Sequence, residues 1–250
     1  MSIPPVPVRE EEVELGALMT PGGDASVPGI VLIHDVWGLG DHPRDLARRL
    51  AREGFAVLAI DLYRRRESIE IKDPGAWIQE LSDPEVISDL EKAADFLAAH
   101  PAVGDESIGV VGFCMGGMYA LLAACLCNGF AASVPFYGLL SHRHGLLQRE
   151  GGLDPAKKPH EPLSVASQLR CPLLGFFGDE DPMIPLDDVR ELESALHGAG
   201  ASSEVVVVAG AGHAFMNDTR PDAFRPVAAA TAWEKMLGFL RATLAKESPR

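Results

Sequence analysis

One glycine-rich stretch, residues 112–117 (Gly-Phe-Cys-Met-Gly-Gly), constrains the fold of this chain more than any other. The residues before it, 107–111, are apolar and largely β-branched, which is typical of a buried strand. The residues after it, 118–127, are rich in alanine and leucine and contain no helix breaker, which predicts a helix. Glycines on both sides of Cys114 fit a sharp, strained turn, because a Cβ at either flank would collide with the neighbouring strand or helix.

The spacing around Cys114 also has a chemical interpretation. Gly-x-Cys-x-Gly between a strand and a helix is the pattern of a nucleophile elbow, with cysteine where serine usually stands. Such a turn places the sulfur at the end of the sheet, where the positive end of the following helix favours a thiolate and a developing oxyanion. The alternative is a cysteine packed in a glycine-rich turn, because free cysteine is among the most buried residue types.

Strand and helix patterns alternate along the whole chain. Further strands are predicted at residues 13–19 (a first, edge strand), 29–34, 55–60, 130–137, 173–177 and 204–208. Helices are predicted at residues 42–53, in a short segment around Trp77, and at residues 82–100, 186–197 and 223–244. Such alternation predicts an α/β fold with a mostly parallel central sheet and helices on both faces. No repeat or linker divides residues 1–250, so we expect a single domain, in which the unpatterned segment 139–164 is a candidate lid.

Composition argues against several classes of protein. The formal net charge of −14 disfavours a nucleic-acid partner, because phosphate binding needs clustered lysine and arginine. No apolar stretch is long enough to cross a bilayer and residues 1–14 contain no signal-peptide core, so we expect no membrane partner and a cytoplasmic location. The four cysteines are expected to be free, as is usual in a cytosolic protein: Cys114, Cys125, Cys127 and Cys171. No metal site is predicted, because the spacing of the cysteines does not suit one.

Two later strand ends carry the residue types that a cysteine nucleophile needs. His213 follows the last predicted strand, and an acidic run, residues 178–182 (Gly-Asp-Glu-Asp-Pro), follows the strand before it. An imidazole can act as the base for a thiol, and a carboxylate can fix the imidazole tautomer and stabilise its charged form. The acid is expected to be Asp181, which directly precedes the proline of the turn, with Asp179 as the alternative. The chain order Cys114, Asp181, His213 is that of α/β-hydrolases.

Taken singly, each of these residues also has a structural interpretation. An isolated loop histidine is more often simply packed than catalytic, and an acid in a turn often only caps it. The combination at three strand ends favours a hydrolase triad, because ligands bind at the carboxyl ends of the strands in such sheets. In this fold one oxyanion-binding N–H comes from the residue after the nucleophile, here Met115. The second is expected from the loop after an early strand, residues 35–38, at Val36.

Five motifs together make the sequence similar to a known family. They are residues 34–39 (His-Asp-Val-Trp-Gly-Leu), 61–63 (Asp-Leu-Tyr), 112–117 (Gly-Phe-Cys-Met-Gly-Gly), 178–181 (Gly-Asp-Glu-Asp) and 212–215 (Gly-His-Ala-Phe). On these motifs the sequence resembles the dienelactone hydrolase family of α/β-hydrolases, and the similarity covers nearly the whole chain. The resemblance implies a triad of Cys114, His213 and Asp181 that works without a metal or organic cofactor. It also implies attack of the thiolate on an ester or lactone carbonyl, followed by hydrolysis of a thioester acyl-enzyme.

The chain departs from the pattern of that family in its charged residues. The family carries a glutamate in the early loop that restrains ionisation of the thiol, and the matching residue here is the shorter Asp35. Asp35 is expected either to modulate the thiol or only to cap its loop. The family also binds a substrate carboxylate through two arginines, and one matching position here is Asn217, while no arginine aligns with the other. The residues that could replace these arginines are Arg64, Arg65, Arg66, Lys72 and Arg220.

The substrate pocket is expected to be small and partly aromatic. The candidate lining residues are Trp37, Trp77, Tyr137, Phe215 and Asn217, although core packing is an equal alternative for each aromatic side chain. The sequence thus predicts a hydrolase of a small ester or lactone, whose oligomeric state it leaves open. The first alternative is a non-catalytic ligand-binding protein or thiol sensor on the same fold. The second is a hydrolase of another bond, such as a peptide or carbon–carbon bond.

Overall fold

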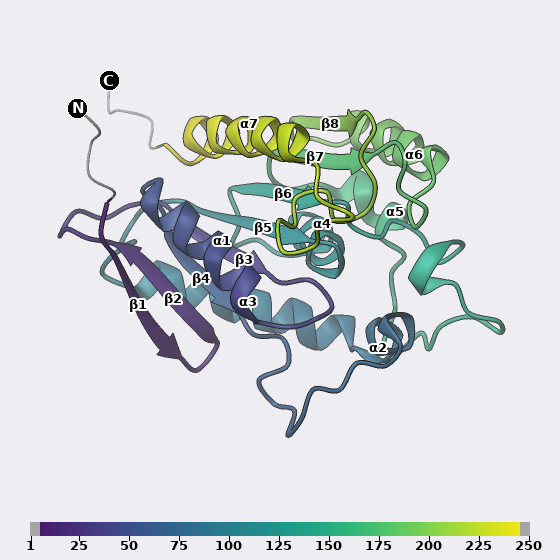
Figure 1. Ribbon diagram of the computed structural model, residues 1–250, viewed down its shortest axis with the longest axis horizontal. Helices are drawn as coiled ribbons and strands as arrows, with labels where there is room; N and C mark the ends of the chain where they lie inside the picture. Colours follow the sequence, from purple (N-terminus) through teal and green to yellow (C-terminus); the bar gives the residue numbers. More distant parts are fainter. Residues whose placement is uncertain (1–5, 246–250) are drawn as a thin grey trace.

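The computed structural model describes residues 6–245, and within this range one sheet of eight strands crosses the molecule (Figure 1). Its strand order is β1-β2-β4-β3-β5-β6-β7-β8. The strands are β1 (Val8–Val13), β2 (Gly16–Pro21), β3 (Gly29–Ile33), β4 (Ala56–Ile60), β5 (Ile108–Phe113), β6 (Ala132–Phe136), β7 (Leu173–Gly178) and β8 (Ser203–Val208). The β1–β2 and β2–β4 pairs are antiparallel, and all neighbouring pairs from β4 to β8 are parallel. The predicted mostly parallel sheet is therefore confirmed.

Helices cover both faces of this sheet, as the sequence predicts. They are α1 (Asp41–Arg52), α2 (Pro74–Glu80), α3 (Asp83–Ala99), α4 (Met115–Leu126), α5 (Pro162–Val165), α6 (Leu186–His197) and α7 (Pro226–Leu244), with short 3₁₀ turns η1 (Gly145–Leu147) and η2 (Ala166–Gln168). Gly29 of β3 pairs with Ile108 of β5, so Gly109, the next residue of β5, points to the opposite face of the sheet. Gly29 faces Leu97 of α3, and Gly109 faces Leu240 of α7, so these two helices lie on opposite faces. Helix α4 packs beside α3, and α1 is joined to the end of α7 by a hydrogen bond.

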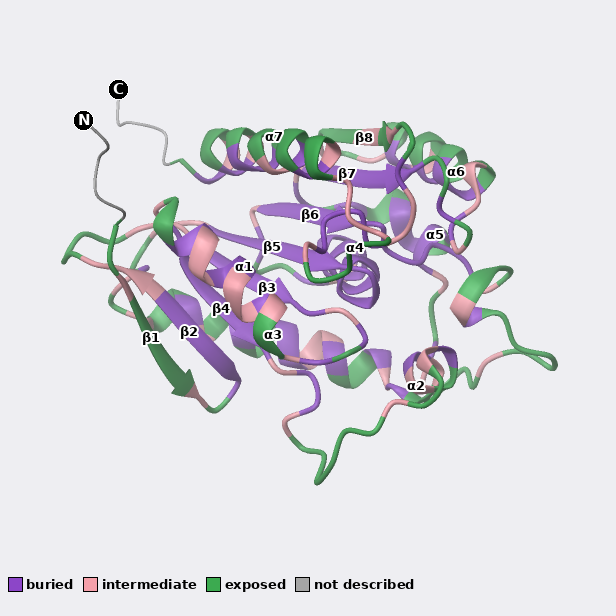
Figure 2. Cartoon of the chain, viewed as in Figure 1, coloured by how far each residue is buried: buried purple, intermediate pink, exposed green. Residues whose placement is uncertain are grey.

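The central strands form the core of the molecule. Every residue of β3, β4, β5, β6 and β7 is buried (Figure 2). These strands are continuous apolar runs because parallel strands covered on both faces have no side exposed to water. Ser133 in β6 is a polar exception, and its hydroxyl donates to the Ala120 carbonyl at 2.9 Å. The rigid core thus fixes the positions of the strand ends, from which the site is built.

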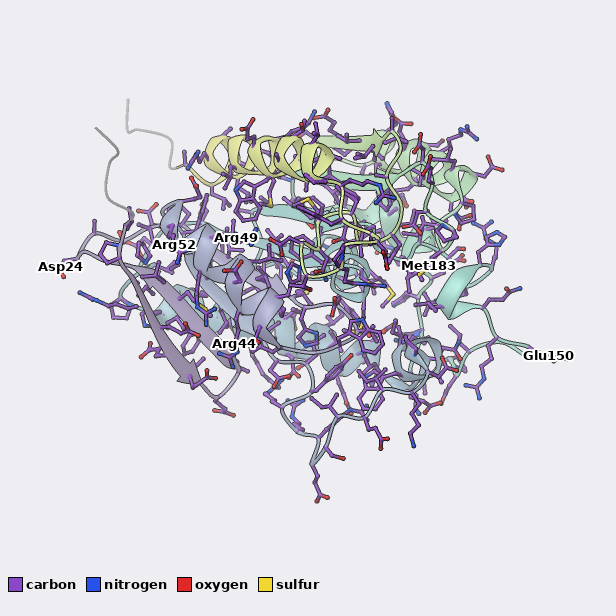
Figure 3. All side chains as sticks on the ribbon, viewed as in Figure 1. Asp24, Arg44, Arg49, Arg52, Glu150 and Met183 are labelled. Atoms are coloured by element: carbon purple, nitrogen blue, oxygen red, sulfur yellow. The ribbon has the colours of Figure 1, made fainter. Side chains whose placement is uncertain are left out.

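The N-terminal edge of the sheet differs from the prediction. A single edge strand over residues 13–19 is wrong, because this range spans the turn between β1 and β2, and β1 is the edge strand. The acidic character of β1 hid it from the sequence pattern. Glu10 and Glu12 form ion pairs with Arg44 of α1, and Glu10 also pairs with Arg48 (Figure 3 labels Arg44). Charged side chains are a common way to protect an exposed sheet edge from pairing with another chain.

The unpatterned segment 139–164 is anchored by a buried polar cluster. The Lys158 ammonium donates to the Asp83 carboxylate at 2.6 Å, and the Tyr119 hydroxyl donates to the same oxygen at 2.8 Å. Asp83 belongs to α3 and Tyr119 to α4, so the cluster ties the segment to both helices. The part of the segment around Glu150, in contrast, projects from the body of the molecule (Figure 3).

Candidate active site

The turn after β5 has the geometry that its glycines suggest. Cys114 adopts a left-handed φ of +56°, and α4 begins directly after it at Met115, three residues earlier than the pattern predicts. A Cβ on Gly112 would lie 1.9 Å from the Gly116 carbonyl oxygen, and a Cβ on Gly116 would lie 2.3 Å from the Ile33 carbonyl oxygen. Only glycine therefore fits at these two positions. The strained turn directs the cysteine to the carboxyl end of the sheet, next to the start of α4.

His213 and Asp181 meet at the same edge of the sheet. The Nδ1 atom of His213 lies 2.8 Å from Oδ2 of Asp181, whose side chain is fully buried. The other carboxylate oxygen of Asp181 accepts a hydrogen bond from the Met183 N–H at 2.9 Å, which fixes the orientation of the group. Asp179, the alternative acid, is exposed and accepts a hydrogen bond from the Gly210 N–H at 2.7 Å. Of the two acids, the structure pairs Asp181 with the histidine.

The second nitrogen of His213 is left without a hydrogen-bond partner. Nε2 is buried, and no acceptor within residues 6–245 lies in hydrogen-bonding geometry with it. Burial alone lowers the pKa of His213, but the electrostatic interaction with the neighbouring Cys114 and the hydrogen bond to Asp181 outweigh it and raise the pKa to about 10. The Tyr137 ring packs edge-on against the imidazole, with the ring centroids 5.2 Å apart. The imidazole is thus held in place with one nitrogen available beside the sulfur.

A cavity of about 220 Å³ opens at this point. The predicted site residues in its wall are Asp35, Val36, Trp37, Cys114, Tyr137, His213 and Asn217. Cys114 is only 7% exposed, so the cavity is the route by which a small molecule reaches the sulfur. A larger groove of about 540 Å³ lies between β8 and α7 and contains none of the predicted residues. We therefore place the candidate site in the smaller cavity.

Two of the predicted lining residues lie behind the cavity wall. Phe215 is fully buried and packs edge-on against Tyr137, with the ring centroids 5.3 Å apart. Trp77 on α2 packs edge-on against Tyr63 at 5.4 Å and lies under the Arg66 guanidinium at 4.5 Å. Phe215 thus supports the wall residue Tyr137 from behind, whereas Trp77 packs on Tyr63 and Arg66, which do not line the cavity.

Asp35 and Asn217, the two departures from the family pattern, each stabilise their own turn. One carboxylate oxygen of Asp35 accepts a hydrogen bond from the Trp37 N–H at 2.9 Å. The side-chain oxygen of Asn217 accepts hydrogen bonds from the N–H and the hydroxyl of Thr219, at 3.0 and 2.6 Å. Because both also line the cavity, each short side chain combines a local structural contact with access to a bound molecule.

Sequence reasoning missed several residues of the cavity wall. His42, in the first turn of α1, has a buried Nδ1 that lies 3.5 Å from Asp218 without a proper hydrogen bond, and burial lowers its pKa. Leu146 enters the wall from the candidate lid, where its carbonyl accepts a hydrogen bond from the Gln79 amide at 2.8 Å. Spacing along the sequence gives no signal for His42 and Leu146, because loops and helices from distant parts of the chain bring them together. Arg220, in contrast, is one of the basic residues that the sequence offers as replacements for the family arginines, and it lines the cavity.

The two backbone N–H groups that the sequence predicts for the oxyanion site, those of Val36 and Met115, have no hydrogen-bond acceptor in the described part of the chain. Met115 is the first residue of α4, and the first N–H groups of a helix have no partner within the helix.

Residues 6–245 contain no group of three His, Cys, Asp or Glu side chains suited to a metal ion. No helix among residues 6–245 is long and apolar enough to span a membrane.

The sheet with its antiparallel N-terminal strands, the elbow and the histidine–acid pair define an α/β-hydrolase. The sequence pattern of the dienelactone hydrolase family matches residues 15–244. The chain therefore belongs to the dienelactone hydrolase family, which confirms the resemblance, and it is a hydrolase with a small-molecule substrate.

Two relatives illustrate the extent of the similarity. A protein of Bradyrhizobium sp, named "Probable 2-oxo-3-(5-oxofuran-2-ylidene)propanoate lactonase", is 33% identical over 233 residues, which cover 92% of this chain and 90% of the relative. A crystal structure from Klebsiella pneumoniae subsp. pneumoniae MGH 78578, described as "Putative Dienelactone Hydrolase", has a TM-score of 0.82 and 29% identity, covering 97% of this chain and 99% of that one.

Proposed function

We propose that the protein hydrolyses small carboxylic esters or lactones, with Cys114 as the nucleophile, His213 as the acid–base and Asp181 as the residue that orients the histidine. One observation carries the proposal: the imidazole is fixed through Nδ1 by Asp181 and keeps Nε2 free beside a sulfur at a nucleophile elbow. This arrangement gives a thiolate–imidazolium pair, the reactive form of a cysteine nucleophile.

The proposed reaction has two half-reactions. The thiolate of Cys114 attacks the carbonyl carbon, and the N–H groups of Val36 and Met115 bind the oxygen that becomes negative. When the tetrahedral intermediate collapses, the carbon–oxygen bond to the leaving group breaks, and the leaving oxygen takes the proton from Nε2 of His213. The neutral imidazole then removes a proton from water, whose oxygen attacks the thioester. Release of the carboxylic acid regenerates the thiolate and the imidazolium.

The size of the cavity restricts the substrates that this mechanism can serve. A cavity of about 220 Å³ is about one and a half times the roughly 150 Å³ that encloses a benzene molecule in other proteins, so we propose a substrate about the size of one substituted ring. Trp37, Tyr137 and Asn217 would contact that substrate from the cavity wall. Phe215 would support the Tyr137 ring from behind the wall, and Trp77 would support the Tyr63 ring. Leu146 would close the cavity from the candidate lid within the single domain.

We also propose that Asp35 modulates the thiol. Its carboxylate lines the same cavity as Cys114, and its hydrogen bond to the Trp37 N–H keeps the loop of Val36 in a defined turn. A negative charge there would oppose formation of a second negative charge on the sulfur. The shorter side chain, compared with glutamate, leaves more room in the cavity.

The test of the proposed function is the variant Cys114→Ala assayed with a panel of small esters and lactones. We expect kcat/KM to fall by roughly 10⁴-fold or more, because no other group can form the acyl-enzyme. Cys125→Ala is the matched control, since Cys125 lies in α4 and burial raises the pKa of its thiol to about 12. Turnover that survives in Cys114→Ala, or that is lost equally in the control, would overturn the proposal.

A further inference from the structure

The Asp-Leu-Tyr motif at residues 61–63 has no part in the mechanism proposed above, yet its tyrosine contacts both residues of the proposed oxyanion site. The Tyr63 hydroxyl donates a hydrogen bond to the Val36 carbonyl at 2.9 Å. The same hydroxyl lies 3.4 Å from the sulfur of Met115. Val36 belongs to the loop after β3 and Met115 is the first residue of α4, so one side chain bridges two segments that are 79 residues apart in sequence.

The Tyr63 side chain is held rigidly enough to act as such a bridge. Its ring is 1% exposed and packs edge-on between His34, at 4.9 Å, and Trp77, at 5.4 Å. A Cβ on Gly38 would lie 3.2 Å from the ring, so the loop after β3 also packs directly on it. At the backbone, the Tyr63 N–H donates to the Asp61 carboxylate at 2.8 Å. Burial raises the pKa of the Tyr63 phenol, so the hydroxyl keeps its proton and remains a donor.

The position of this contact matters for an oxyanion site. Two N–H groups stabilise a developing negative oxygen only if they are fixed at the right separation before the charge forms. The N–H of Met115 is fixed by the elbow and by α4. The N–H of Val36 belongs to a loop, and the hydrogen bond from Tyr63 to the carbonyl of the same residue limits its movement. The contact with the Met115 sulfur then sets the loop relative to the helix start.

We propose that Tyr63 is a positioning residue, whose hydroxyl holds the N–H groups of Val36 and Met115 at the separation that binds the oxyanion. This inference rests on the proposed function. It gives a role to the Asp-Leu-Tyr motif and to Trp77, which supports the ring from α2 without reaching the cavity.

The experiment compares Tyr63→Phe with the wild type in two reactions of the same cysteine. Ester hydrolysis develops an oxyanion, whereas alkylation of the thiol by iodoacetamide does not. We expect kcat for ester hydrolysis to fall by about tenfold with KM nearly unchanged, since loss of a whole oxyanion donor costs roughly 10²- to 10³-fold and this variant only misplaces one. The rate of Cys114 alkylation should stay within about twofold, because the thiolate–imidazolium pair is untouched.

Tyr119→Phe is the matched control. Tyr119 is also a fully buried tyrosine with a bonded hydroxyl, but its partners are Asp83 and Lys158, which do not line the cavity. An equal loss of kcat in this control, or a parallel loss of alkylation in Tyr63→Phe, would mean a general structural effect and would overturn the inference. Cys114-dependent turnover that Tyr63→Phe leaves unchanged would overturn the role of Tyr63 alone. Turnover independent of Cys114 would overturn the proposed function as well.

Discussion

Two buried histidines of this molecule have similar surroundings and opposite chemistry. His34 follows β3 and His213 follows β8, and each has an aspartate nearby. At His34 both ring nitrogens are used by the backbone: Nδ1 bonds the Asp35 carbonyl at 2.5 Å, and Nε2 accepts the Leu62 N–H at 3.2 Å. The Asp61 carboxylate is 4.0 Å away. Burial lowers the pKa of His34, which stays neutral and joins two loops.

His213 differs in which nitrogen is left free. Its Nδ1 bonds the carboxylate of Asp181, and its Nε2 has no partner among the described residues and lies beside the sulfur of Cys114. Its pKa is therefore raised instead of lowered. Burial and a nearby acid are common to both histidines, so neither feature distinguishes the proposed acid–base from a structural histidine. The distinguishing feature is a free nitrogen that faces a group able to exchange a proton with it.

The largest expected effect comes from removing that free nitrogen. The substitution His213→Asn keeps a donor for Asp181 but has no atom in the place of Nε2. We expect kcat/KM for ester hydrolysis to fall by roughly 10⁴-fold or more, because both half-reactions lose their acid–base. Urea titration at pH 7 should also show a lower free energy of unfolding, because the variant loses the stabilisation that is linked to the raised pKa of His213. A variant that retains a tenth of wild-type activity would show that His213 is only a packed loop histidine.

The same substitution at His34 is expected to lower stability while largely preserving activity. In His34→Asn the amide can take the place of Nδ1, but the buried N–H of Leu62 loses its acceptor. We expect the free energy of unfolding to fall by about 1–3 kcal/mol, the cost of an unsatisfied buried donor. Because the fold survives, kcat/KM should stay within about tenfold of wild type. If His34→Asn instead abolished turnover without loss of stability, the contrast between the two histidines would be broken.

The two histidines also differ in how they link stability to pH. His213 binds its proton more tightly in the folded protein than at its ordinary pKa of 6.5, so its stabilisation is present below pH 6.5 and is lost as the pH rises towards about 10. The pKa of His34 is lowered from 6.5, so its contribution is present above pH 6.5 and is lost as the pH falls.

Urea titrations at several pH values check this prediction. The difference in unfolding free energy between wild type and His213→Asn should shrink from pH 6.5 to 10, and the difference for His34→Asn should shrink below pH 6.5. In a Cys114→Ala background the thiolate charge is gone, so the pKa of His213 should drop and the first trend should move to lower pH. Parallel pH trends for both histidines would contradict the assignment of opposite pKa shifts.

Much of the fold follows from local sequence signals. The apolar runs of β3 to β7 are buried on both faces of the sheet. Continuous apolar runs of this length predict buried parallel strands wherever the helices pack. The glycines around Cys114 permit a strained turn that other residues would block, so the elbow can be predicted from the sequence. The N-terminal hairpin was missed because its acidic strand is stabilised by ion pairs with α1, a contact that no local pattern can reveal.

The candidate site also combines features that local sequence patterns predict with features that depend on how the chain packs. Cys114, His213 and an acidic turn at residues 178–182 can be recognised at strand ends from the sequence, because strand–turn patterns and residue chemistry are local properties. The sequence favours Asp181 but leaves Asp179 open, and the folded structure pairs Asp181 with the imidazole. The cavity wall likewise mixes residues from distant loops and helices, whose distances depend on how those elements pack against the sheet. Packing is a property of the whole chain. The sequence therefore predicts the candidate reacting groups, but it cannot predict the shape of the cavity around them.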